Sequence, residues 1–354
     1  MELDRRQFAT AMGAALIAAV ATPGRAAREA MAAAPFDPLP FVHPDLRPLV
    51  GPIMKMAGGP GMSAATLAKS RQGMASFVTP ILPDVPWTQQ TITGKAGQPD
   101  VVLYVINAGR KASPRPAILH MHGGGYIVGT ARSSIGDLQP IARDLDCVIV
   151  TVEYRLAPET PFPGPLDDNY AGLKWLHANA AELGADPARI AVMGESAGGG
   201  HAAMLALAAR DRKEVPVAFQ CLIYPMLDDR TGSTVKKPPQ QGAIIWTPES
   251  NRFGWTSLLG VPAGSPRVPA GSVPARVADL SGLPPTFISV GSIDLFVDED
   301  VDYARRLADA GVLTELVVMP GAFHGFDRFG AAPLVKRYQQ HLMAALRQGL
   351  SIAA

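Results

Sequence analysis

The first motif that could do chemistry is Gly194-Glu195-Ser196-Ala197-Gly198. It follows an apolar run typical of a buried strand and opens an Ala-rich stretch typical of a helix. Glycines on both sides of a serine permit a tight, strained turn that lifts the hydroxyl above a sheet, at the amino terminus of a helix. A serine held in this way is suited to nucleophilic attack on an acyl carbon, so Ser196 is the first candidate catalytic residue.

Such a serine needs a base, which follows it in the chain in this strand–turn–helix context. His201 lies only five residues into the helix that Ser196 opens, so its side chain is expected to point elsewhere. His341 lies within a terminal helix and is expected to face solvent. His324 stands in a loop directly after an apolar strand. We therefore predict that His324 is the base.

The same arrangement needs an acid between the serine and the histidine. Asp294 ends an apolar run, which places its carboxylate at the carboxyl edge of a sheet. Asp228 and Asp229 also follow a strand and are the rival candidates. The acidic residues 298–300 are interpreted as helix-start residues that the helix dipole favours. Asp294 is the predicted acid.

A glycine-rich loop, His122-Gly123-Gly124-Gly125-Tyr126, follows another apolar strand. Without side chains to cover them, the N–H groups of such a loop can stabilise the negative oxygen that develops during acyl transfer. We predict that Gly124, Gly125 and the N–H of Ala197 form this oxyanion hole.

Alternating strands and helices must position these residues. Apolar runs of strand length occupy 101–106, 117–121, 147–153, 189–193, 219–224, 286–290 and 314–318. Stretches with helical spacing of apolar residues occupy 167–183, 197–210, 298–310 and 332–347. This alternation predicts a mostly parallel sheet with helices on both faces.

Two segments interrupt the alternation and are expected to form a helical cap over the site. Residues 35–80 are rich in proline and suggest short, broken helices, and an insertion at about 228–272 interrupts the catalytic domain, 81–354. The alternative is a pair of surface loops. The candidate residues of the substrate pocket are Tyr126, Trp246, Phe253, Trp255 and Phe296.

In several blocks that occur in the same order, the sequence is similar to the hormone-sensitive-lipase-like family of bacterial esterases. The matching blocks, in order, are 122–125, 153–159 with Phe162-Pro163, 194–198, 225–230, 291–299 and 324–326. The resemblance implies an α/β-hydrolase fold with an eight-stranded sheet and a catalytic triad of Ser196, Asp294 and His324. It also implies a cofactor-free carboxylesterase for short- to medium-chain acyl esters. Many members carry Asp or Thr in place of Glu195, which bears on the subgroup and not on the triad.

Other acyl-transfer reactions would use the same catalytic residues. Amide or thioester hydrolysis and deacetylation remain alternatives, because a serine triad serves acyl transfer in general. Some plant hormone receptors resemble the family but lack the histidine that matches His324, so a non-catalytic binding protein is the least favoured alternative. The block 154–159 is interpreted as an ion-paired turn that braces the oxyanion loop.

Composition excludes several other classes. With 32 basic and 31 acidic side chains in 354 residues, the chain has no large net charge that would attract nucleic acid or an anionic membrane.

His120 and His122 have no third metal ligand near them in the sequence, so no metal is expected. By resemblance, Cys147 and Cys221 lie on strands separated by two others, which predicts buried free thiols. A homodimer is possible.

Residues 1–34 are predicted to form a separate segment. Arg5 and Arg6 precede a weakly apolar, Ala-rich run that is too short to span a bilayer. This pattern resembles a twin-arginine export signal and predicts a periplasmic or secreted protein. The alternative is a helix that remains part of the cap of a cytoplasmic protein.

Overall fold

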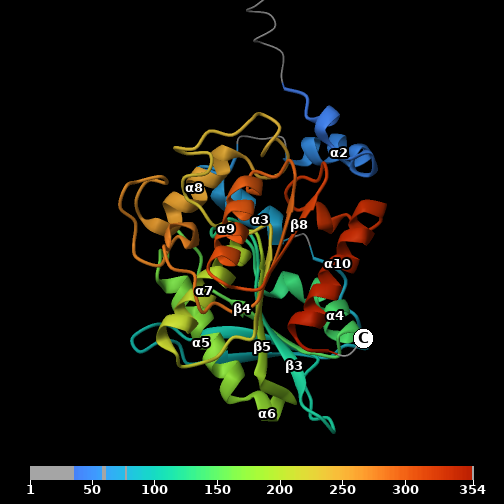
Figure 1. Ribbon diagram of the computed structural model, residues 1–354, viewed down its shortest axis with the longest axis vertical. Coiled ribbons are helices and arrows are strands. Elements are labelled where there is room, and N and C mark those ends of the chain that lie inside the picture. Colours follow the sequence, from blue (N-terminus) through green and yellow to red (C-terminus); the bar gives the residue numbers. More distant parts are fainter. Residues whose placement is uncertain (1–35, 58–60, 76–77, 353–354) are drawn as a thin grey trace, which may run out of the picture. The chain divides into compact units, whose positions relative to one another are not determined.

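An eight-stranded sheet in the order β1-β2-β4-β3-β5-β6-β7-β8 organises the chain, in a computed structural model that describes residues 36–57, 61–75 and 78–352 (Figure 1). The described residues from Pro38 onward form one compact unit. The segment predicted to be an export signal lies outside the described residues.

All neighbouring strands from β4 to β8 run parallel, and β2 runs antiparallel to both of its neighbours. The strands are β1 (Trp87–Ile92), β2 (Val101–Ile106), β3 (Arg115–Met121), β4 (Val148–Glu153), β5 (Ala185–Glu195), β6 (Phe219–Ile223), β7 (Thr286–Gly291) and β8 (Thr314–Met319). The predicted mostly parallel sheet is therefore confirmed.

Helices cover both faces of this sheet, as the alternation predicted (Figure 1). The longer ones are α2 (Arg47–Ala57), α3 (Leu67–Ala75), α4 (Ile135–Asp144), α5 (Gly164–Ala178), α7 (Ala197–Arg212), α8 (Pro248–Leu259), α9 (Val297–Asp309) and α10 (Pro333–Gly349). A short helix, α6 (Ala180–Leu183), follows α5. The apolar sides of α5, α7 and α9 share one buried cluster, and those of α2, α4 and α10 share another.

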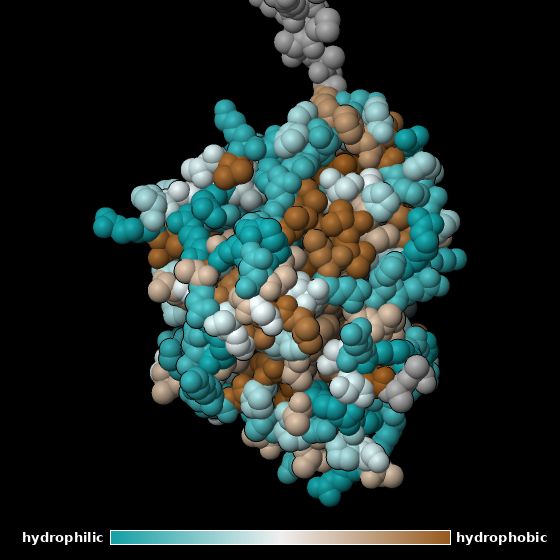
Figure 2. Space-filling model, in the orientation of Figure 1, coloured by the Kyte–Doolittle hydropathy of each residue, from teal (hydrophilic) through white to brown (hydrophobic). Residues whose placement is uncertain are grey.

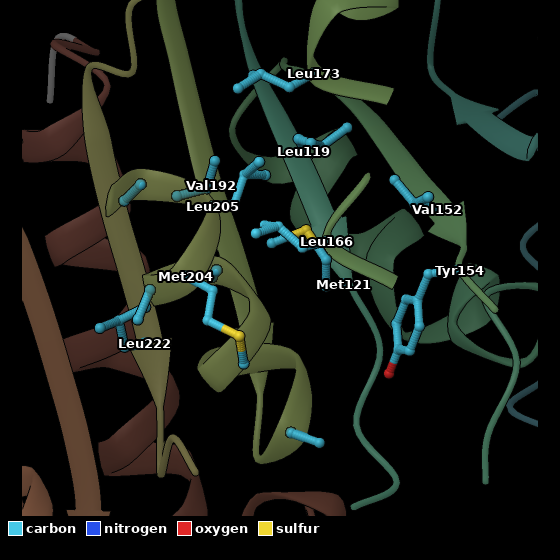
Figure 3. Packing of buried hydrophobic residues seen from close by; sticks show 14 of the residues in the cluster. Leu119, Met121, Val152, Tyr154, Leu166, Leu173, Val192, Met204, Leu205 and Leu222 are labelled. Atoms are coloured by element: carbon cyan, nitrogen blue, oxygen red, sulfur yellow. The ribbon is translucent and has the colours of Figure 1, made fainter. Parts of the chain in front are cut away.

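Successive strand residues supply these two clusters alternately, because side chains along a strand point to opposite faces. In β3, Leu119 belongs to the cluster of α5 and α7, and its neighbour Ile118 belongs to the cluster of α4 and α10. Figure 3 shows Leu119 and Val192 of the sheet together with Leu173 of α5 and Leu205 of α7. Burial on both faces makes the central strands almost continuously apolar.

The two cysteines are buried free thiols, as predicted. Cys221 lies in β6 and Cys147 directly precedes β4, with β3 and β5 between these strands. At about 4.8 Å per strand, their separation exceeds the reach of a disulfide.

Most of the surface on the face that Figure 2 shows is polar, with an apolar area near the upper end of β8. This is the end of the sheet at which the parallel strands finish, and α3 and α8 lie at the same end (Figure 1). Within the described ranges, no helix has the length and apolarity needed to cross a membrane.

Candidate active site

The turn between β5 and α7 holds Ser196 in a strained conformation, with φ at 58° and ψ at −120°. Only glycine fits on either side of this turn. A Cβ atom on Gly194 would lie 2.4 Å from the backbone of Gly198, and one on Gly198 would lie 2.0 Å from the carbonyl oxygen of Met121. Close packing of strand, turn and helix therefore explains both glycines of the motif, and it fixes Ser196 at the start of α7.

Ser196, His324 and Asp294 form one hydrogen-bonded chain. His324 Nε2 lies 2.9 Å from Ser196 Oγ, and His324 Nδ1 lies 2.9 Å from Asp294 Oδ2. Because a carboxylate only accepts, Nδ1 carries the proton and Nε2 accepts from the serine hydroxyl. The exposed fractions are 6% for Ser196, 5% for His324 and 0% for Asp294. The backbone N–H of Phe296 donates to the other oxygen of Asp294 at 3.0 Å and so fixes the carboxylate.

The rival side chains contact other groups. The Asp228 carboxylate pairs with Arg230 at 2.7 Å, and the buried Asp229 carboxylate pairs with Arg276 at 2.7 Å. His341 is exposed on α10. His201 packs between two aromatic rings away from the Ser196 hydroxyl, as the sequence predicted.

The glycine-rich loop after β3 lies directly beside the serine. A Cβ atom on Gly123 would lie 3.5 Å from Cβ of Ser196. Gly124 and Gly125 have φ angles of 126° and 59°, in the region that favours glycine. Within the part of the chain that the structure describes, the N–H groups of Gly124, Gly125 and Ala197 donate no hydrogen bond to another protein group. These three N–H groups are therefore available for a ligand oxygen.

The turn after β4 braces this loop, as the sequence predicted. The Tyr154 hydroxyl donates to the carbonyl oxygen of His122 at 2.6 Å, and the N–H of Ala157 donates to the carbonyl oxygen of Tyr126 at 3.0 Å. Arg155 pairs with the buried Asp168 of α5 at 2.7 Å, and this ion pair connects the turn to a helix that covers the sheet.

The two segments predicted to form a cap contact each other. The N–H of Met62, just before α3, donates to Ser250 Oγ of α8 at 3.0 Å. In α8, Thr247 Oγ1 accepts the N–H of Ser250 at the helix start, a local capping contact that orients the helix. Residues before α3 thus meet the insertion after β6 at the end of the sheet where Ser196 lies.

Residues 118–328 match the family described as alpha/beta hydrolase fold. The carboxylesterase NlhH of Mycobacterium tuberculosis is 33% identical over 317 residues, which cover 86% of this chain and 97% of that relative. The chain belongs to this family. It is a carboxylic ester hydrolase of the hormone-sensitive-lipase-like group that its motifs predicted.

Two further relatives agree with this assignment. The ethyl acetate hydrolase of Pseudomonas putida is 31% identical over 281 residues, which cover 71% of this hydrolase and 86% of the relative. The structure of a bacterial heroin esterase matches with a TM-score of 0.80 at 38% identity, over 89% of this chain and 99% of the other.

Three of the predicted pocket residues of this hydrolase are fully buried. Tyr126, Trp255 and Phe296 each have an exposed fraction of 0%. The ring of Tyr126 packs edge-on against Trp255 at 5.0 Å, and the ring of Phe296 packs edge-on against His324 at 5.2 Å. All three are therefore packed as buried neighbours of the active site, and their place in the walls of an enclosed substrate pocket stays a prediction.

The other two predicted pocket residues lie in or beside the insertion. The ring of Trp246 fills the space beside Gly125, where a Cβ atom would lie 2.1 Å from it, and its centre is 6.4 Å from that of His324. Trp246 Nε1 donates to Asn251 Oδ1 at 3.1 Å, which fixes the indole. Phe253, in α8, is half-buried against the core.

Two of the acidic residues at the start of α9 are buried, which the sequence did not indicate. Asp298 is exposed, but Glu299 and Asp300 are not. Glu299 Oε1 accepts the N–H groups of Leu227 and Asp228 at 2.7 and 3.1 Å, so it holds the loop after β6. Burial, followed by the charge of Asp228, raises the pKa of Glu299 to about 8.

Glu195 also has a structural partner. Both of its carboxylate oxygens lie 3.1 Å from His120 Nε2, and His120 Nδ1 lies 2.9 Å from Thr151 Oγ1. Burial opposes ionisation of Glu195, but the charge and the hydrogen bond of His120, together with the charge of Arg328, outweigh it and lower the pKa of Glu195. The residue before the serine therefore links β5 to β3 and β4. Among the described residues, no group of three or more His, Cys, Asp or Glu side chains is arranged to hold a metal ion.

Proposed function

We propose that this hydrolase is a serine carboxylesterase that cleaves short- to medium-chain acyl esters through an acyl-enzyme. The single observation that best supports this proposal is the chain from Ser196 Oγ through His324 to Asp294, with 2.9 Å at each step. Distances of this size are the ones that proton transfer to a base and orientation of that base require.

In the first half-reaction, His324 Nε2 takes the proton of Ser196 as Oγ attacks the ester carbonyl carbon. The carbonyl oxygen becomes an oxyanion, and the free N–H groups of Gly124, Gly125 and Ala197 stabilise it. The bond from carbon to the alcohol oxygen then breaks. His324 returns the proton to that oxygen, the alcohol leaves, and the acyl group remains on Ser196.

In the second half-reaction, His324 takes a proton from water, and the resulting hydroxide equivalent attacks the acyl carbon. The bond to Ser196 Oγ breaks, the serine regains a proton from His324, and the carboxylic acid leaves. Throughout, Asp294 accepts from Nδ1–H, which keeps the imidazole in the reactive tautomer and stabilises its charged form.

Trp246 is proposed to limit the length of the acyl group. Each buried CH₂ of a substrate contributes about 0.8 kcal/mol until the pocket is full, after which further methylenes must displace packed side chains. An indole fixed by Asn251 cannot move aside easily. We expect an optimum near four to six acyl carbons. The name of the ethyl acetate hydrolase relative agrees with a short-chain substrate.

Amide hydrolysis, thioester hydrolysis and deacetylation use the same residues, so the test compares substrates that share one acyl group. Butyryl ester, butyryl thioester and butyryl anilide are assayed with the wild type and with Ser196→Ala. The proposal predicts the highest kcat/KM for the ester and loss of all three activities in the variant. A higher kcat/KM for the thioester or the anilide would favour that alternative.

Export through a twin-arginine route remains part of the proposal. In a bacterium with this route, the wild type should yield a periplasmic form that begins near residues 27–33. Replacing Arg5 and Arg6 with lysine should leave the full-length chain in the cytoplasm. A wild-type protein that stays cytoplasmic with an intact amino terminus would contradict export.

A further inference from the structure

The donors of the proposed oxyanion hole come from two separate segments. Gly124 and Gly125 follow β3, whereas Ala197 begins α7. Stabilisation of an oxyanion requires that donors stay within about 0.5 Å of the productive geometry. Some contact must therefore fix the glycine-rich loop relative to the turn that carries Ser196.

A buried hydrogen-bonded bridge connects these two segments through a third. The hydroxyl of Tyr126 donates to the carbonyl oxygen of Met226 at 2.9 Å. The N–H of Met226 donates to the carbonyl oxygen of Ser196, also at 2.9 Å. Tyr126 directly follows Gly125 in the chain, so the bridge runs from the oxyanion loop to the nucleophile through one residue of the loop after β6.

The surroundings of the Tyr126 hydroxyl leave it no alternative position. A Cβ atom on Gly200 would lie 2.2 Å from this hydroxyl and 2.3 Å from the Met226 carbonyl oxygen, so only glycine leaves the slot open. The Tyr126 ring contacts His201 and Trp255 edge-on, with ring centres 4.9 and 5.0 Å apart.

The backbone conformation and the protonation state of Tyr126 are consistent with a hydroxyl donor held in one position. Its φ angle is 70°, which is unfavourable for a bulky side chain and persists only where surrounding contacts enforce it. Burial raises the pKa of the Tyr126 hydroxyl well above its usual value, so the group remains a donor.

We infer that Tyr126 is a positioning residue, whose hydroxyl holds the oxyanion loop in register with Ser196 through the backbone of Met226. The inference rests on the proposed function and adds a residue that does not touch the substrate. Loss of the hydroxyl should therefore weaken stabilisation of the transition state and leave binding of the substrate largely unchanged.

The experiment compares Tyr126→Phe with Tyr303→Phe. Tyr303 of α9 is a matched control, because it is fully buried and its hydroxyl has no hydrogen-bond partner among the described residues. We expect Tyr126→Phe to lower kcat about tenfold to a hundredfold with KM changed less than about twofold. Tyr303→Phe should retain the wild-type kcat.

A boronic acid that adds to the serine separates positioning from general loss of structure, since its tetrahedral adduct places an oxygen in the oxyanion hole. The inhibition constant should rise in Tyr126→Phe by about the same factor as kcat/KM falls. An unchanged inhibition constant, a change confined to KM, or a kcat equal to that of Tyr303→Phe would overturn the inference. Failure of the boronic acid to inhibit the wild type would instead overturn the proposed function.

Discussion

Arg71 of α3 donates from Nε to the backbone carbonyl oxygen of Ile127, two residues after Gly125, at 2.8 Å. The same guanidinium forms a bidentate ion pair with Glu159, at 2.8 and 2.7 Å, and donates to the carbonyl oxygen of Ala157. One side chain from the proposed cap thus holds both the oxyanion loop and the turn that braces it.

Replacing Arg71 with methionine should lower both stability and activity. The variant keeps the apolar stem but loses hydrogen bonds to two backbone carbonyls, at a cost of about 1–3 kcal/mol. Thermal unfolding and kcat/KM are measured beside Lys69→Met, which removes an exposed charge from the same helix. Equal kcat/KM in the two variants would show that the cap contact does not affect the oxyanion loop.

Asp294→Asn should reduce kcat by about 10³–10⁴-fold, because an amide at this position no longer holds the reactive tautomer of His324. Asp228→Asn is the matched control, since its carboxylate pairs with Arg230 instead. We expect it to retain most of the activity. Near-normal kcat in Asp294→Asn, together with an inactive Asp228→Asn, would reverse the assignment of the acid.

Glu299 should make stability fall as the pH rises. Burial, then the charge of Asp228, raises the folded-state pKa of Glu299 to about 8 from its usual 4.5. The folded state therefore binds more protons than the unfolded state between these values, and its contribution to stability decreases with pH by up to about 1.4 kcal/mol per unit.

Glu299→Gln removes this titration and keeps an oxygen to accept from Leu227 and Asp228. Urea unfolding at pH 5, 7 and 9 should show the variant gaining stability relative to the wild type as the pH rises. The carboxyls of Asp228, Asp294 and Asp300 and the ammonium of Lys237 lie around this region and are unchanged in the comparison. A constant difference across the three pH values would contradict a raised pKa.

Trp246→Ala should move the preferred acyl chain to greater length. Removing the indole beside Gly125 opens space that additional methylenes can fill, at about 0.8 kcal/mol each. The kcat/KM values for acyl chains of two to twelve carbons are compared with those of Trp175→Ala, which removes a half-buried indole from α5. An unchanged optimum in Trp246→Ala would show that other side chains set the limit.

Strongly apolar elements could be predicted from the sequence, and elements with mixed composition could not. The run 101–106 coincides with β2, and 197–210 lies within α7. In contrast, β1 is an edge strand with four exposed residues in succession, so it lacks an apolar pattern. Helix α4 contains Pro140, which the usual rules place outside helix interiors.

The residues of the site likewise include some that could be predicted from the sequence and some that could not. Ser196, Asp294 and His324 could be selected because each follows a strand, and strand ends converge at one edge of a parallel sheet. The burial of Tyr126 and Trp255 could not be predicted, because it depends on how the insertion after β6 packs. No sequence pattern indicated that Arg71 contacts the site, since its partners lie more than 50 residues away in the sequence.

The most direct test of the central claim is covalent labelling with an alkyl phosphonate ester, followed by mass spectrometry of the intact chain and its peptides. Attack by Ser196 Oγ on phosphorus expels the leaving group and leaves a stable adduct, so the wild type should gain one phosphonyl group on Ser196 and lose activity in proportion. Ser196→Ala should remain unlabelled and inactive while unfolding at a similar temperature. A label on another residue, or an active Ser196→Ala variant, would contradict the account.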